Sequence, residues 1–209
     1  MNYLNLRLSA AMWARVLLLW FALAIGSLVV GGIALGLGGF IQDNIRNELT
    51  AQQISFSAAD QLSDEERLIP GLVENAGQPL KTGNQARVYS EIIALHMRES
   101  ANEAGYPDAA YATLGKVQRE FRTAVAATTD SGDEAGLAEA QAGLTTVTHL
   151  RNSMLTGSNL RGNLLSAYGW DNVATGVTAA GAFILVLSVL FFALFFYEWR
   201  HGHLPPKEA

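Results

Sequence analysis

The sequence has 209 residues, no cysteine and a net charge of −5, with 14 basic and 19 acidic side chains. The absence of cysteine excludes disulfides, zinc–thiolate sites, iron–sulfur clusters and thiol catalysis. An excess of acidic groups repels phosphate backbones, so we expect no nucleic acid partner.

The first predicted element is a membrane-spanning helix at residues 16–41. No charged side chain occurs in this segment of 26 residues. An α-helix of that length is about 39 Å long, which exceeds the roughly 30 Å hydrocarbon core of a bilayer. A signal-peptide core has only about 7–15 apolar residues, so we expect the segment to be retained as an anchor. Residues 1–15 are predicted to form a cytoplasmic or interfacial N-terminus.

A second uncharged segment at residues 172–197 predicts a second span, followed by a cytoplasmic tail at 198–209. Small residues in one half of each span can let two helices approach closely. In an antiparallel hairpin these halves lie at the same depth, so we expect Gly32 and Gly36 to pack against Gly176 and Ala180. Homodimerisation through the same face is the alternative.

The orientation follows from the basic residues that flank the spans, because these are retained on the cytoplasmic side. The two tails carry four of them and the loop flanks carry two: Arg7, Arg15, Arg200 and Lys207 against Arg46 and Arg161. We therefore expect both termini in the cytoplasm, with the chain in the plasma membrane (the bacterial inner membrane) and residues 42–171 outside.

The segment 42–171 is predicted to be helical. Ile41, Ile45 and Leu49 extend the first span as a helix. Later helices are expected from a start signal at 82–84 to about 103, from the turn at 105–108 to 129, and after a turn and N-cap at 130–134. The last is expected to break at Gly157 before it resumes into the second span. With directions that alternate, these helices form an antiparallel bundle of four. The fold class is thus an all-α membrane protein: a two-helix transmembrane hairpin flanking an extracytoplasmic antiparallel helical bundle.

Residues 54–83 are expected to be an irregular cap across the distal end of this bundle. Ser63 and Glu66 have the spacing of a capping box. The segment is much longer than an ordinary connection and keeps apolar side chains, so it is either a packed lid or a docking element. Its candidate interaction surface consists of six residues: Phe56, Leu62, Leu68, Ile69, Leu72 and Val73.

The sequence points to no catalytic, cofactor-binding or metal-binding residues. Acidic residues 64–66 are interpreted as the first turn of a helix rather than as metal ligands, and His96 as a core or boundary residue. No motif of a hydrolase, a nucleotide-binding loop or a metalloprotease occurs. The spans contain no Asp, Glu, Lys, Arg or His, which argues against an ion path or a membrane haem. We therefore expect no enzyme and no cofactor.

Three stretches carry a resemblance to a known group: residues 48–56 (ELTAQQISF), 76–86 (AGQPLKTGNQA) and 160–169 (LRGNLLSAYG). In these, the chain resembles a family of two-span actinobacterial membrane proteins. The resemblance extends over nearly the whole chain and implies the same topology. It implies no activity and no site residues.

Two functions follow as hypotheses. The first is a membrane-anchored helical interaction module, or an accessory subunit of an envelope complex, whose partners are the lipid bilayer and a membrane protein or a second copy. The second is an extracytoplasmic ligand sensor. Because the tail of twelve residues leaves no room for an output domain, such a sensor would signal through a separate membrane partner.

Overall fold

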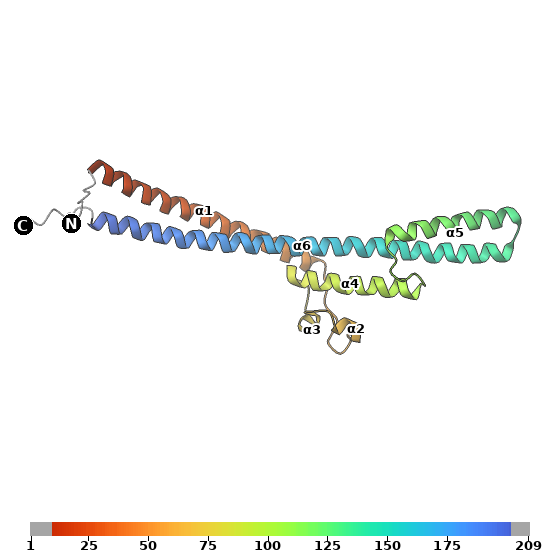
Figure 1. The fold of residues 1–209 in the computed structure, drawn as a ribbon. Helices are drawn as coiled ribbons and strands as arrows, with labels where there is room; N and C mark the ends of the chain where they lie inside the picture. Colours follow the sequence, from red (N-terminus) through yellow and green to blue (C-terminus); the bar gives the residue numbers. More distant parts are fainter. Residues whose placement is uncertain (1–9, 202–209) are drawn as a thin grey trace, which may run out of the picture. The chain divides into compact units, whose positions relative to one another are not determined.

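The computed structural model describes residues 10–201, which form α-helices and no strand (Figure 1). The predicted all-α class is thereby confirmed. The elements are α1 (Ala10–Ala51), α2 (Asp64–Arg67), α3 (Leu72–Asn75), α4 (Gly83–Glu103), α5 (Tyr111–Ser131) and α6 (Glu134–His201). The predictions for the N-terminus before residue 10 and for the end of the tail, which include Arg7 and Lys207, lie outside the described residues.

The chain divides into two compact units. The hairpin unit holds residues 10–44 and 172–201 of the described part, and the helical unit holds residues 45–171. Helices α1 and α6 run through both units, and each contains an apolar stretch long enough to cross a membrane. The predicted continuation of the first span as a helix past Ile41 is confirmed, because α1 ends only at Ala51.

Small residues recur every seventh position where α1 and α6 pack in the hairpin unit. Each set of three is buried: Ala24, Gly31 and Gly38 on α1, and Ala174, Gly181 and Ser188 on α6. The positions pair in antiparallel order, since a Cβ on Gly181 would lie 3.0 Å from the carbonyl oxygen of Gly31 and the Ser188 hydroxyl donates to the Ala24 carbonyl over 2.7 Å. A seven-residue period keeps one face of each helix on its partner along a left-handed pair.

The predicted packing of Gly32 and Gly36 against Gly176 and Ala180 is therefore wrong in its residues. A Cβ added to Gly32, Gly36 or Gly176 would meet no heavy atom within 4 Å, and Ala180 is exposed. The prediction followed a four-residue spacing, whereas the helices remain in contact over several turns. Contact over several turns requires small residues at every seventh position, and on α1 this set includes Gly31 instead of its neighbour Gly32.

Aromatic rings take the place of small residues near the beginning of α1. Trp20 stacks on Phe191 with ring centroids 5.9 Å apart, and Phe21 meets Phe195 at 5.5 Å. Rings need more space between two helices than glycine does, and α1 and α6 diverge toward this end of the hairpin unit (Figure 1). The unit thus has a closely packed half and an open, aromatic half.

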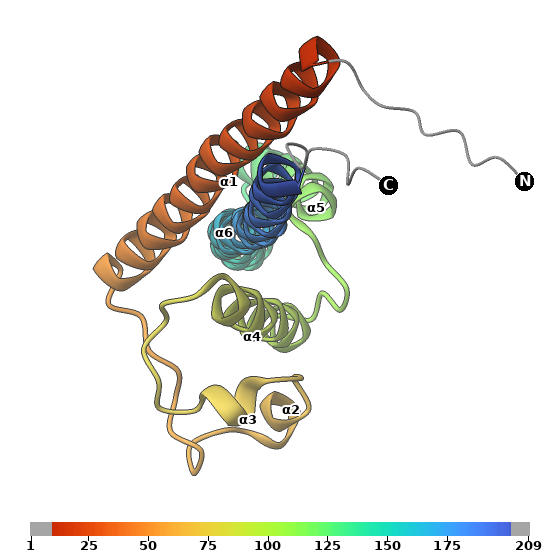
Figure 2. The same cartoon turned by 90° about the vertical axis from the view of Figure 1, so that its left-hand side faces the viewer.

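In the helical unit, α4 lies between α6 and the segment that carries α2 and α3 (Figure 2). Its N-terminus is fixed by Thr82, whose side chain accepts from the Gln85 amide in a capping box. On the α6 side, the Met97 side chain occupies the space that a Cβ on Gly157 would need. Val88 and Ile92 are buried in the apolar cluster that α4 shares with the cap. Helix α4 therefore buries two faces, whereas the sequence pattern indicated a single apolar stripe.

The direction of α4 differs from the prediction, which had it parallel to α6, whereas α5 runs antiparallel to α6 as predicted. Ser90 of α4 accepts a hydrogen bond from Arg161, while in α5 Gln118 donates to Thr148 over 2.8 Å. Later residues of the α4–α5 chain thus meet earlier residues of α6, and both helices run antiparallel to it, one after the other (Figure 1). The predicted alternation of directions, and with it the antiparallel bundle of four helices, is wrong.

The physical reason lies in the length of α6, which continues without a break from Glu134 to His201. The predicted interruption at Gly157 does not occur, since one glycine inside a helix costs only about 1 kcal/mol. The absence of a side chain there is what admits Met97. Along the unbroken α6, α4 and α5 pack against successive lengths of the helix, one after the other.

The cap occupies the end of the helical unit where α1 enters and α6 leaves, so its predicted place at the distal end is also wrong. Its buried side chains share one cluster with Leu49 of α1 and Leu164 of α6. The backbone closes on itself where the Phe56 amide donates to the Gln78 carbonyl over 2.9 Å. The predicted capping box of Ser63 and Glu66 is confirmed.

Candidate functional site

The structure separates the six predicted interaction residues of the cap into a core and a surface. Phe56, Leu62 and Leu72 are buried in the cluster beneath the cap, which corrects their assignment to an interaction surface. Ile69 is partly buried against the same cluster. Leu68 and Val73 are exposed, Leu68 to 81% of its possible area. The cap is thus a packed lid that also presents two apolar side chains.

A groove lies beside Leu68, between the cap and α4. It has a volume of about 320 Å³. Its apolar lining comes from both elements: Leu68, Ile69 and Pro70 of the cap and Leu95 of α4. Three charged side chains of the cap and of α4 also line it: Glu65, Glu91 and Arg98. The lining of the groove thus combines apolar and charged side chains.

A contact between the side chains of His96 and Glu66 joins the cap to α4 at this groove. Nε2 of His96 lies 3.1 Å from Oε1 of Glu66, while Oε2 of Glu66 accepts from the Ser63 amide over 2.9 Å. His96 is 56% exposed, so its assignment as a core or boundary residue is wrong. Glu66 lies in the first turn of α2 as predicted. Both oxygens of Glu66 have partners, and the lid is fixed to the helix beneath it.

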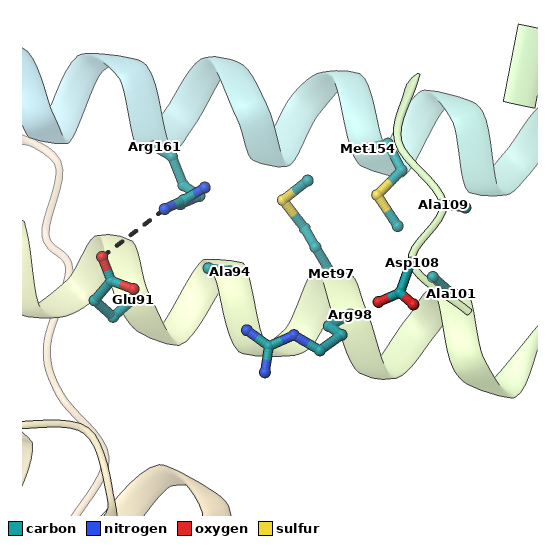
Figure 3. A pocket seen from close by; sticks show the side chains of 9 residues that line it. All are labelled: Glu91, Ala94, Met97, Arg98, Ala101, Asp108, Ala109, Met154 and Arg161. Carbon is teal, nitrogen blue, oxygen red and sulfur yellow. Dashed lines mark ion pairs between the residues drawn. The ribbon is translucent and has the colours of Figure 1, made fainter. Parts of the chain in front are cut away.

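A second hollow shares Glu91 and Arg98 with this groove and opens where α4 faces α6 and the 104–110 connection (Figure 3). Its volume is about 350 Å³. Met97 of α4 and Met154 of α6 lie side by side in the space between the two helices (Figure 3), and small side chains also line the pocket: Ala94, Ala101 and Ala109. We call this hollow the methionine pocket.

Four charged side chains surround the methionine pocket, two of each sign. Arg161 donates through Nε to the Ser90 carbonyl over 3.0 Å, and its guanidinium lies 3.8 Å from Glu91 (Figure 3). Arg98 and Asp108 have no hydrogen bond or ion pair with any residue between 10 and 201. Two of the charges thus satisfy each other, and one cation and one anion remain free.

Sequence reasoning did not find the methionine pocket, because its lining comes from three separate stretches of chain. A signal existed in α4, where Ala94, Met97 and Ala101 form a second stripe beside Val88 and Ile92. Only the position of α6 shows that this stripe faces a partner. Among residues 10–201, no three histidine or acidic side chains gather in a way that could hold a metal ion.

Comparisons with family models, curated proteins and solved structures found no match to this chain. Function must therefore be argued from the surfaces and pockets themselves.

Proposed function

We propose that this chain is a membrane-anchored helical interaction module, an accessory subunit of an envelope complex in the plasma membrane. The exposed side chains of the hairpin unit support the membrane part. Leu18, Ile33 and Val189 are 72%, 65% and 68% exposed. Large apolar surfaces of this kind are unfavourable in water and favourable against lipid tails.

The proposed orientation has both termini in the cytoplasm and the helical unit outside, because basic residues that flank membrane spans are retained on the cytoplasmic side. We expect an impermeant maleimide to label Glu74→Cys on intact cells and to leave Lys207→Cys unlabelled until the cells are opened. Glu74 is exposed, and the chain has no cysteine of its own to add background. Labelling of position 207 alone on intact cells would reverse the proposed orientation.

The observation that carries the interaction function is the exposure of Leu68 on a cap that is otherwise packed. Its neighbours Leu62 and Leu72 are buried at 6% and 0% exposure. Other apolar residues thus form the core of the cap, and the large side chain of Leu68 is not part of that core. A partner protein with an apolar face would cover Leu68 and Val73 with little rearrangement of the cap.

We expect Leu68→Ser combined with Val73→Ser to abolish co-purification of the partner from detergent-solubilised membranes. The melting temperature should stay within about 2 °C of the wild type, because exposed substitutions cost little. The matched control is Leu155→Ser, since Leu155 is a 41% exposed leucine on α6. Equal recovery of the partner with the double variant and with the control would refute the cap as the docking surface.

The hairpin unit offers a second surface to a membrane partner or a second copy. Gly32 and Gly36 have open space where a Cβ would lie, and a Gly-x-x-x-Gly face permits close approach of another helix in lipid. Since this face is not used between α1 and α6, it supports an accessory subunit that associates within the membrane.

The methionine pocket favours a second candidate function, an extracytoplasmic ligand sensor with a separate membrane partner. Met154 and Arg161, which line the pocket, belong to α6. The same helix continues unbroken to the residues that pack on α1, Ala174 and Gly181. A ligand that shifts the pocket wall thus has a continuous helix through which it can act. Such a sensor should change the α1–α6 contact when the pocket is filled.

A further inference from the structure

We propose that the methionine pocket binds a small zwitterion, a free α-amino acid with an apolar side chain. This inference rests on the ligand-sensing candidate function and gives that function a ligand class. It starts from the two kinds of surface that meet in the pocket, an apolar floor and a rim of opposite charges.

The floor suits a flexible apolar group. Met97 and Met154 contribute thioethers, which are polarisable and adapt to irregular shapes. The alanines beside them expose only methyl groups, so the volume of about 350 Å³ stays open. That volume is at the lower end of the range of small-molecule sites, and four of the nine lining residues are charged.

The rim suits a ligand that carries both charges. Glu91 and Arg161 face each other and leave Arg98 and Asp108 as the free cation and anion. A ligand with one charge would gain one attraction at this rim and meet a repulsion from the group of the same sign. A ligand with a carboxylate and an ammonium can pair with Arg98 and Asp108 together.

The two free groups differ in how firmly they are held. Asp108 has a φ of 61°, in the left-handed region that aspartate tolerates better than most residues. The turn before it is closed by the Tyr106 amide, which donates to Ala101 over 2.8 Å. Arg98 is exposed on α4 and its side chain lies along that helix (Figure 3). The turn thus fixes the carboxylate of Asp108 that would bind the ammonium group, and the exposed guanidinium of Arg98 would bind the carboxylate of the ligand.

Binding can be measured by isothermal titration of the full chain in lipid nanodiscs with each of the twenty amino acids. We expect saturable binding of one or more apolar amino acids, such as methionine or leucine. Their N-acetyl and decarboxylated forms should bind at least ten-fold more weakly, because each lacks one charge. Absence of binding by every amino acid at 10 mM, or equal binding of the N-acetyl form, would overturn the proposal.

Two substitutions locate the site. Asp108→Asn keeps a residue that accepts the left-handed conformation, and Arg98→Gln removes a side chain without a partner among residues 10–201. Each should weaken binding about ten-fold at an unchanged melting temperature. Asp130→Asn and Arg119→Gln, exposed residues of α5, are the controls and should bind like the wild type. Unchanged affinity in both pocket variants would overturn the assignment.

The zwitterion proposal and the sensing function are tested by different measurements. Spin labels at the exposed positions 25 and 189, next to the contact of Ala24 with Ser188, report the distance between α1 and α6 with and without the bound amino acid. Binding without a change in the label distance would retain the site and remove the sensing role. If a native extract changed the label distance and none of the amino acids did, the sensing function would be retained and the zwitterion proposal would be refuted.

Discussion

Gly181→Leu should separate α1 from α6 and destabilise the hairpin unit by about 1–3 kcal/mol, in the range of overpacked interiors. A Cβ at this position would lie 2.9 Å from the Cβ of Ala34 and 3.0 Å from the Leu35 amide nitrogen. Backbone cannot move aside as a flexible side chain can. The measurement is oxidative crosslinking of Ala24→Cys with Ser188→Cys, a pair joined in the wild type by a 2.7 Å hydrogen bond.

The matched control is Gly176→Leu, the same substitution five residues earlier in the same helix. A Cβ at this position would meet no heavy atom within 4 Å, so the 24–188 crosslink should form as in the wild type. Gly32→Leu should be equally neutral in the same assay for the same reason. If the crosslink disappeared with Gly176→Leu and persisted with Gly181→Leu, the seven-residue contact would be refuted.

Leu72→Ala should destabilise the helical unit by about 2–5 kcal/mol, the usual cost of removing a buried leucine side chain. Leu72 is 0% exposed and belongs to the cluster that joins the cap to α1, α4 and α6. The expected fall in melting temperature is roughly 10 °C or more. Circular dichroism of the purified chain in detergent measures it.

Leu68→Ala is the control for this substitution. It removes the same atoms from a leucine four residues earlier, whose side chain is 81% exposed. It should change the free energy of unfolding by less than about 0.5 kcal/mol. The two variants thus separate the stabilising part of the cap from its exposed part. Equal destabilisation by both would mean that the cap has no free apolar surface.

Local signals in the sequence predicted most of the helical segments. The Thr82 capping box begins α4, and the turn at 130–134 ends α5 at Gly132 with φ 70°. Asp133 then accepts from the Gly136 amide at the start of α6. Such signals lie within a few residues of one another, so their chemistry does not depend on the rest of the chain.

The sequence by itself determined the helical class, the two long apolar stretches and the separate character of residues 54–83. Only the tertiary structure decided which glycines pack, because Gly31 and Gly32 are equally small and the crossing of two helices selects one of them. It likewise decided that α4 and α5 follow one another along α6, and that Arg98 and Asp108 share a pocket. These features depend on which distant segments of the chain pack together. The uninterrupted α6 determines this packing, because α4 and α5 lie along it one after the other.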